Sequence, residues 1–106
     1  MTLETINGRI AESAAVLLYV TTTDCSVCKV LKPKVEELLA DRFPEMVFIA
    51  VELDLLPAIG RQYEVFSVPT VIAFFQGREH VRKVRVFGLK ELAEALGRPY
   101  SLLFGG

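Results

Sequence analysis

The only two cysteines of the chain are Cys25 and Cys28, which are separated by Ser26 and Val27. An apolar run at residues 14–20 leads to the pair, and a helical pattern starts at it. Two thiols at this spacing can form a disulfide when they lie on the first turn of a helix. Unpaired N–H groups and the helix dipole at that position lower the pKa of the first thiol. The pair therefore predicts thiol–disulfide chemistry.

Two other interpretations of the cysteines are weaker. A zinc site needs about four ligands, and the chain adds only one histidine, His80, in a predicted hairpin far from the pair. Inert core cysteines would need an apolar approach, whereas Thr21-Thr22-Thr23-Asp24 is polar. The sequence predicts no metal and no cofactor other than a redox-active disulfide between Cys25 and Cys28.

The composition is that of an ordinary folded domain. The 106 residues are predicted to form a single domain over 1–106, and an apolar fraction of 52% argues against disorder. Twelve Lys and Arg against 13 Asp and Glu give a net charge of −1, so no nucleic-acid partner is expected. No apolar run reaches the roughly 20 residues of a membrane span, and the N-terminus lacks a signal-peptide pattern. We expect a cytoplasmic location and no membrane partner.

Hydrophobic periodicity predicts an alternation of helices and strands. In chain order we expect a helix at 3–13, a strand at 14–20, a helix at 25–42, a strand at 46–51, a helix at 57–64, strands at 70–75 and 81–87, and a helix at 89–96. The two strands around the helix at 25–42 make a parallel crossover, and the last two strands make a hairpin.

This order predicts an α/β fold with a central mixed four-stranded sheet and helices on both faces. The expected strand order is 46–51, 14–20, 70–75, 81–87. The C-terminal tail, residues 98–106, is rich in apolar side chains and has no predicted place. We expect it to dock on its own domain rather than on another subunit.

Several details of these elements are also predicted. Asp24 is a candidate N-cap for the helix at 25–42, Pro33 is expected to kink that helix, and Gly97 is expected to end the last one. One face of the helix at 25–42 carries a set of apolar residues, Val27, Val30, Leu31, Val35, Leu38 and Leu39.

The isolated charged residues receive ordinary interpretations. Glu52 and Asp54 follow a strand and could approach the cysteines, but they are expected to be loop acids, with Asp54 near the cap of the next helix. The basic stretch Arg82, Lys83 and Arg85 is expected to protect an edge strand from aggregation. His80 is expected to be a solvated hairpin residue.

A second motif, Ser67-Val68-Pro69-Thr70, stands directly before the strand at 70–75. A proline at the start of a strand cannot donate to the ladder. A cis proline there would be a retained special geometry, whereas an ordinary trans turn proline is the alternative.

Together these segments resemble the thioredoxin family, over roughly residues 12 to 97. The interval from Cys28 to Pro69 also resembles that of typical thioredoxins. The segments that carry the resemblance are Cys25-Ser26-Val27-Cys28-Lys29, Pro33, Val68-Pro69-Thr70 and the hairpin Gln76-Gly77-Arg78-Glu79.

The resemblance implies the thioredoxin fold, with Pro69 cis and packed beside the cysteines. It implies that Cys25 is the exposed nucleophile and Cys28 the buried resolving thiol. Substrate would bind at Ser26, Val27, Val68 and Pro69, with the backbone of Val68 bonded to an extended peptide. The implied partners are protein disulfides and a thiol-reducing donor such as a thioredoxin reductase.

The chain departs from the family pattern at several positions. Asp24 stands where thioredoxins usually carry Trp, and Ser26-Val27 replaces Gly-Pro between the cysteines. Tyr19 replaces a buried Asp, and Ala50 replaces the Lys usually paired with that Asp. Because tyrosine has an unperturbed pKa near 10, it is a poor base at neutral pH.

The function predicted from these residues is thiol–disulfide exchange with protein disulfides through Cys25 and Cys28. The departures leave two alternatives open, a non-enzymatic binding module of the same fold and a redox sensor. Glutathione-dependent chemistry of the glutaredoxin kind is less favoured, because no second glutathione-binding motif is found near residues 85–91.

Overall fold

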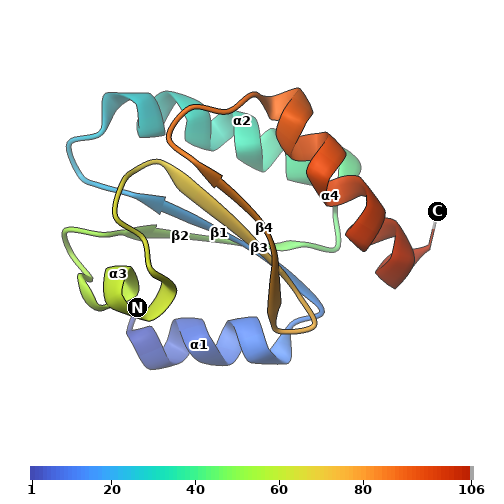
Figure 1. Ribbon diagram of the computed structural model, residues 1–106, viewed down its shortest axis with the longest axis horizontal. Helices are drawn as coiled ribbons and strands as arrows, with labels where there is room; N and C mark the ends of the chain where they lie inside the picture. The colour runs from blue at the N-terminus through green and yellow to red at the C-terminus, as the bar shows by residue number, and fades with distance from the viewer. Residues whose placement is uncertain (106) are drawn as a thin grey trace.

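A mixed four-stranded sheet lies at the centre of the molecule, between two layers of helices (Figure 1). The computed structural model describes residues 1–105. The elements in chain order are α1 (Leu3–Glu12), β1 (Ala15–Thr21), α2 (Ser26–Arg42), β2 (Val47–Glu52), α3 (Ala58–Tyr63), β3 (Thr70–Phe75), β4 (Arg78–Val84) and α4 (Leu89–Phe104).

The strand order is β2-β1-β3-β4, which confirms the predicted fold class. β1 pairs in parallel with β2 and antiparallel with β3, and β4 pairs antiparallel with β3. The central strands β1 and β3 are buried along almost their whole length, as strands covered on both faces should be.

Alternation along β1 divides the core between the two faces of the sheet. Leu17 and Tyr19 point to the side of α2 and α4. Leu18 and Val20 point to the other side, where Ile6 of α1 packs on them. All five side chains are inaccessible to solvent, so both faces are closed by helices.

The last strand is shifted from its prediction. We predicted residues 81–87, whereas β4 is Arg78–Val84. Gln76 and Gly77 have φ values of 54° and 79°, the left-handed conformation of a two-residue hairpin turn. Such a turn returns the chain at once, so the strand starts earlier. It also ends earlier, because Arg85 has a φ of 65° and leaves the ladder.

The last helix is longer than its prediction. Gly97 does not end it, and α4 continues past Pro99 to Phe104. Tyr100 and Phe104 pack against the core beneath α2 and α4, and the N–H of Glu45 donates to the Tyr100 hydroxyl at 3.0 Å. This packing outweighs the poor helix propensity of glycine and proline. The tail therefore lies on its own domain through Phe104, and Gly106 is outside the described residues.

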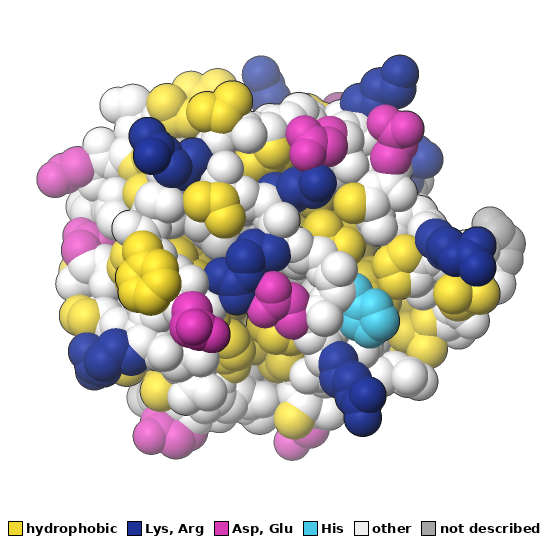
Figure 2. Space-filling view, viewed as in Figure 1, with side chains coloured by type: hydrophobic (Ala, Val, Ile, Leu, Met, Phe, Trp, Pro, Cys, Tyr) yellow, Lys and Arg dark blue, Asp and Glu magenta, His cyan; other side chains and the backbone are white. Residues whose placement is uncertain are grey.

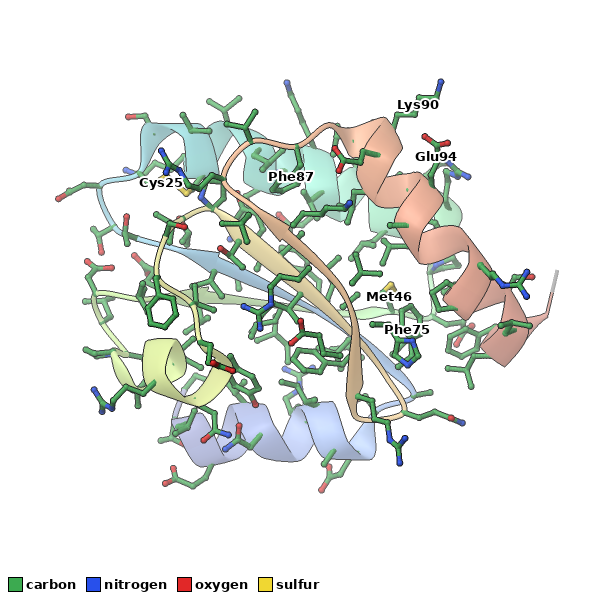
Figure 3. The ribbon with its side chains drawn as sticks, in the orientation of Figure 1. Cys25, Met46, Phe75, Phe87, Lys90 and Glu94 are labelled. Carbon is green, nitrogen blue, oxygen red and sulfur yellow. A yellow bond between two sulfur atoms is a disulfide. The ribbon has the colours of Figure 1, made fainter. Side chains whose placement is uncertain are left out.

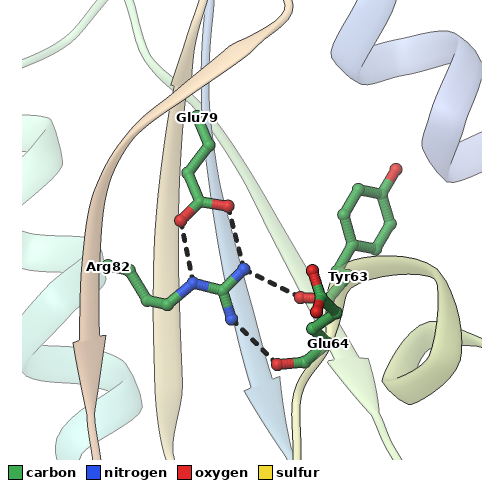
Figure 4. A network of polar contacts seen from close by, with 4 residues as sticks. All are labelled: Tyr63, Glu64, Glu79 and Arg82. Atoms are coloured by element: carbon green, nitrogen blue, oxygen red, sulfur yellow. Dashed lines mark hydrogen bonds and ion pairs between the residues drawn. The ribbon is translucent and has the colours of Figure 1, made fainter.

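Arg82 connects β4 to the end of α3 (Figure 4). Its guanidinium donates to the carbonyl oxygens of Tyr63 at 2.8 Å and Glu64 at 3.1 Å, and it forms a bidentate ion pair with Glu79. The pKa of Glu79 is lowered chiefly by the hydrogen bonds from Arg82. The basic stretch is thus not only a charged edge, because one of its members fixes the start of the segment that leads to Pro69.

None of the helices within residues 1–105 has both the length and the apolar character that crossing a bilayer requires.

Candidate active site

Cys25 and Cys28 form a disulfide at the start of α2. Their Cα atoms are 5.2 Å apart, within the range that a disulfide can bridge. Figure 3 shows Cys25 at this end of the helix, and Phe87 on the same side of the sheet. The prediction that the pair lies on the first turn of a helix is confirmed.

The two sulfur atoms have different surroundings. Cys25 is partly exposed, whereas Cys28 is 1% exposed and packs in the core. The backbone N–H of Cys28 donates to the sulfur of Cys25 at 3.1 Å. Because a free helix N–H stabilises an anion, this contact favours a thiolate at Cys25 once the disulfide is reduced.

Cys25 itself is the N-cap of α2, which corrects the prediction that Asp24 caps the helix. The helix starts one residue later than expected, at Ser26. The sulfur of Cys25 takes the capping hydrogen bond, so Asp24 is left exposed in the connector. Asp24 and Lys29 therefore place opposite charges near the pair on exposed side chains.

Tyr19 lies beneath the disulfide and is fully buried. Its hydroxyl donates to the carbonyl oxygen of Cys28 at 2.7 Å. Burial raises the pKa of Tyr19 to about 12. Its partner on the neighbouring strand is Ala50, the other position where the chain departs from the thioredoxin pattern. Tyr19 is therefore a neutral hydrogen-bond donor that anchors the motif, and it takes no proton at neutral pH.

Two carboxylates hold the connector that precedes Cys25. The N–H of Thr23 donates to Asp54 at 3.1 Å, and its hydroxyl donates to Glu52 at 2.9 Å. The hydrogen bonds from Thr23 are the main reason that the pKa of Asp54 is lowered. The sequence favoured loop acids over acids that approach the site, because the contact joins segments that are distant in the chain.

The peptide bond between Val68 and Pro69 is cis, the form that the resemblance implies. The hydroxyl of Thr70 donates to the carbonyl oxygen of Ser67 at 2.7 Å and closes this turn. The carbonyl of Pro69 accepts the N–H of Arg85 at 2.7 Å. The turn is therefore fixed to the end of β4.

A groove with a volume of about 440 Å³ begins at the motif. One wall is α2, starting with Ser26 and Val27, and the other is the connection between β4 and α4. Of the predicted substrate site, Ser26 and Val27 line the groove, whereas Val68 and Pro69 do not. Arg85 connects the two parts, because it lines the groove and its N–H bonds the carbonyl of Pro69. The residues lining the groove are Ser26, Val27, Val30, Leu31, Lys34, Arg85, Val86 and Phe87.

The apolar face predicted for α2 is only partly a core face. Val35 and Leu39 are buried, but Val27 and Val30 are 64% and 61% exposed. The helix presents its buried stripe to the sheet and a second apolar stripe to the groove. The sequence carries more apolar residues on this helix than packing on the sheet requires. This excess was the sequence feature that could have indicated the groove.

A smaller hollow of about 250 Å³ lies on the other side of the motif. It extends to Tyr19 and is bordered by Lys29, Lys32 and Glu52. The polar lining contrasts with the apolar groove, so the two sides of the cysteine pair present different chemistry.

His80 lies on β4, with its ring edge-on to Phe75 at 5.6 Å between centroids. Within residues 1–105, no three His, Cys, Asp or Glu side chains come together as metal ligands do. His80 is exposed, as expected of a solvated hairpin residue.

The fold and site define a class of protein, an α/β domain with a Cys-x-x-Cys pair at a helix N-terminus and a cis-proline turn before a central strand. The family model that matches is Thioredoxin, over residues 1–97. A thioredoxin of Staphylococcus aureus is 39% identical over 88 residues, which are 82% of this chain and 84% of that one. The thioredoxin-like protein YdfQ of Bacillus subtilis is 28% identical, over 83% of this chain and 78% of that one.

Solved structures show the same fold. A Plasmodium falciparum thioredoxin superposes with a TM-score of 0.79 at 23% identity, covering 88% of this chain and 92% of that one. Thioredoxin 1 of Thermosipho africanus has a TM-score of 0.74 at 26% identity, covering 82% and 96% of the two chains. The chain belongs to the thioredoxin family.

Proposed function

We propose that the protein is a dithiol–disulfide oxidoreductase that exchanges with protein disulfides through Cys25 and Cys28. The observation that carries this proposal is the asymmetry of the pair, a partly exposed Cys25 whose sulfur accepts a helix N–H and a buried Cys28. Such a pair provides one sulfur for attack and one for resolution.

In the first step, the Cys25 thiolate attacks one sulfur of a substrate disulfide. The bond between the substrate sulfurs breaks, and a mixed disulfide with Cys25 forms. The sulfur that leaves is a thiolate. The N–H of Cys28 stabilises the attacking thiolate, and the groove beside Ser26 and Val27 admits the substrate segment.

In the second step, Cys28 attacks the sulfur of Cys25 and releases the second substrate sulfur. The proton of the Cys28 thiol passes to the substrate thiolate freed in the first step. The second substrate sulfur leaves as a thiolate and takes its proton from solvent, which received the proton of Cys25 when the Cys25 thiolate formed. In sum, the substrate disulfide gains two electrons and two protons, and the protein dithiol becomes the Cys25–Cys28 disulfide. Tyr19 does not accept the proton, because its pKa of about 12 keeps its hydroxyl protonated.

Insulin reduction with dithiothreitol as donor tests the proposal. Wild-type protein should accelerate reduction above the dithiothreitol background, and Cys25→Ser should abolish the acceleration. Cys28→Ser should instead accumulate a mixed disulfide with the substrate, seen as added mass. Equal, background-level rates for wild type and Cys25→Ser would count against the proposal.

We also propose the partners and the compartment that this chemistry needs. The substrates are protein disulfides, with an extended segment lying along the backbone of Val68 next to Pro69. A thiol donor, such as a thioredoxin reductase, must reduce the Cys25–Cys28 disulfide after each turnover. A reducing direction suits the cytoplasm, where dithiols are kept reduced.

The alternative is a binding module or redox sensor, and the observation that favours it is the absence of a buried acid at Tyr19. The reduction potential of the Cys25–Cys28 pair shows whether the protein reduces or oxidises its substrates. A reductase should have a potential nearer the roughly −270 mV of reducing thioredoxins than the roughly −120 mV of a strong oxidant. If the double variant Cys25→Ser/Cys28→Ser kept both partner binding and the biological phenotype, the binding module would be favoured.

A further inference from the structure

The apolar groove beside the cysteines carries positive charge, and we propose that it selects substrates by sequence. This inference rests on the proposed function and names its substrate class. The class is protein disulfides whose flanking segment is extended and apolar and carries an Asp or Glu carboxylate that pairs with Arg85. Arg85 is the specificity-determining residue.

Several of the side chains that line the groove are apolar and well exposed. Val27, Val30 and Val86 are 64%, 61% and 94% exposed, and all three line it. Exposed apolar side chains gathered at one place mark a contact site more often than scattered ones do. Figure 2 shows apolar and basic side chains side by side over the start of α2 and the connection after β4.

Arg85 holds a backbone conformation that suits glycine. Its φ is 65°, in the left-handed region that a side chain seldom adopts. The N–H of Arg85 donates to the carbonyl of Pro69 at 2.7 Å, so the conformation is fixed by the turn that borders the substrate site. An arginine in a strained conformation, on the wall of a groove that begins at the cysteine motif, points to a role for its side chain.

The charges of this strand are not equally available. Arg82 pairs with Glu79 and Lys83 with Glu91, each at 2.8 Å. Arg85 has no ion pair within residues 1–105.

Lys34 adds a second cation to the groove, although it also borders a hollow lined by Glu37 and Asp41. Three acids lie near the cysteines, and none of them lines the groove. Asp24 belongs to the connector before Cys25, and Glu52 and Asp54 are bonded to that connector through Thr23. A carboxylate on the substrate is therefore attracted to the groove side of the pair.

The test uses two peptides of equal length, each a disulfide dimer with leucine beside the cysteine. One carries Asp two residues from the cysteine, and the other carries Lys there. Prereduced protein is mixed with each in a single turnover, and the rate of Cys25–Cys28 disulfide formation is measured. Wild type should reduce the Asp peptide faster, on the order of tenfold, and 0.5 M salt should shrink this ratio.

Two substitutions at Arg85 probe the charge. Arg85→Gly suits the backbone and should bring the ratio near one. Arg85→Glu should reverse it, a gain that loss of folding cannot imitate. Arg78→Glu, an exposed residue at the other end of β4, is the matched control and should keep the wild-type ratio.

Reduction of hydroxyethyl disulfide, a small substrate without flanking residues, shows whether the protein is active. If it is active, equal rates for both peptides with wild-type protein, or a preference for the Asp peptide that survives Arg85→Glu, would overturn this inference alone. If wild type reduces neither peptide nor hydroxyethyl disulfide, the proposed function fails, and the inference fails with it. Equal preference in Arg78→Glu and Arg85→Glu would show a general charge effect and would also overturn it.

Discussion

Tyr19 shows how a single residue can keep the geometry of a motif while changing its chemistry. The hydroxyl bonds the carbonyl of Cys28 at 2.7 Å, so it holds the first turn of α2 on the sheet. An aspartate at this position would be able to exchange a proton with Cys28, whereas a tyrosine with a pKa of about 12 is confined to donating a hydrogen bond. In the proposed exchange, the substrate thiolate therefore takes the role of proton acceptor.

The raised pKa of Tyr19 predicts a change in stability at alkaline pH. The unfolded state loses the phenolic proton near pH 10, whereas the folded state keeps it until about pH 12. Stability due to Tyr19 is thus present below pH 10 and is lost as the pH rises toward 12, by about 2–3 kcal/mol. Tyr19→Phe loses one hydrogen bond, about 1 kcal/mol, and has no such titration.

Urea denaturation of the oxidised protein from pH 7 to 11.5 measures this effect. Wild type should be more stable than Tyr19→Phe at pH 7, and the order should reverse near pH 11. A constant difference across the whole range would show that Tyr19 does not keep its proton in the folded state.

The cysteine pair and the Val68–Pro69 turn of the candidate site could be located from the sequence because their signals are local. Cys25 and Cys28 are adjacent on one turn, and Val68 and Pro69 directly precede a strand. The contacts that position these residues could not be predicted from the sequence, because they join segments that are distant in the chain. Tyr19 bonds a carbonyl on the next element, and the conformation of Arg85 follows from a hydrogen bond to Pro69.

Among the helices and strands, the boundaries that were predicted wrongly are those determined by turns and by packing. The start of β4 follows from the left-handed residues Gln76 and Gly77, and its end from Arg85. The length of α4 follows from the docking of Tyr100, because neither Gly97 nor Pro99 favours a helix. The interiors of β1, β3 and the other helices were correct, since strong hydrophobic patterns fix them.

The link between β4 and α3 makes a prediction about the site. Arg82→Ala removes two hydrogen bonds to the carbonyls of Tyr63 and Glu64. Because these bonds come from a charged group that is only partly exposed, we expect a loss of about 1–2 kcal/mol in the free energy of unfolding. We also expect faster amide exchange in residues 64–68, which lose their anchor to β4.

The matched control is Arg78→Ala, which removes an exposed arginine from the same strand and should change stability by less than about 0.5 kcal/mol. Hydrogen exchange measured by mass spectrometry follows both variants. Unchanged exchange in residues 64–68 of Arg82→Ala would mean that the Val68–Pro69 turn is held by the sheet alone.

In the whole molecule, the two faces of the sheet differ in what they pack against. The face under α1 and α3 is a closed apolar core. The face under α2 and α4 contains the buried sulfur of Cys28, the Tyr19 hydroxyl and the C-terminal turns. The family model ends at residue 97, so the last turns of α4 are an addition to the matched region.

These last turns should contribute strongly to stability. The ring of Tyr100 is edge-on to Phe43, with centroids 5.1 Å apart, and lies 4.7 Å from the ring of Phe104. Its hydroxyl accepts the N–H of Glu45. Tyr100→Ala removes both ring contacts and this bond, so we expect a loss of about 2–3 kcal/mol. Tyr100→Phe keeps the rings and should lose only about 0.5–1 kcal/mol.

Leu102→Ala is the control, because Leu102 lies in the same turns but is 75% exposed, and it should change stability by less than about 0.5 kcal/mol. Chemical denaturation of the three variants gives the free energies. If Tyr100→Ala were no less stable than Leu102→Ala, the end of α4 would not be part of the core. Since the ring and hydroxyl of Tyr100 contact Phe43, Phe104 and Glu45 rather than the cysteines, the reduction potential of the pair should stay at the wild-type value in all three, which separates the support of the fold from the chemistry of the site.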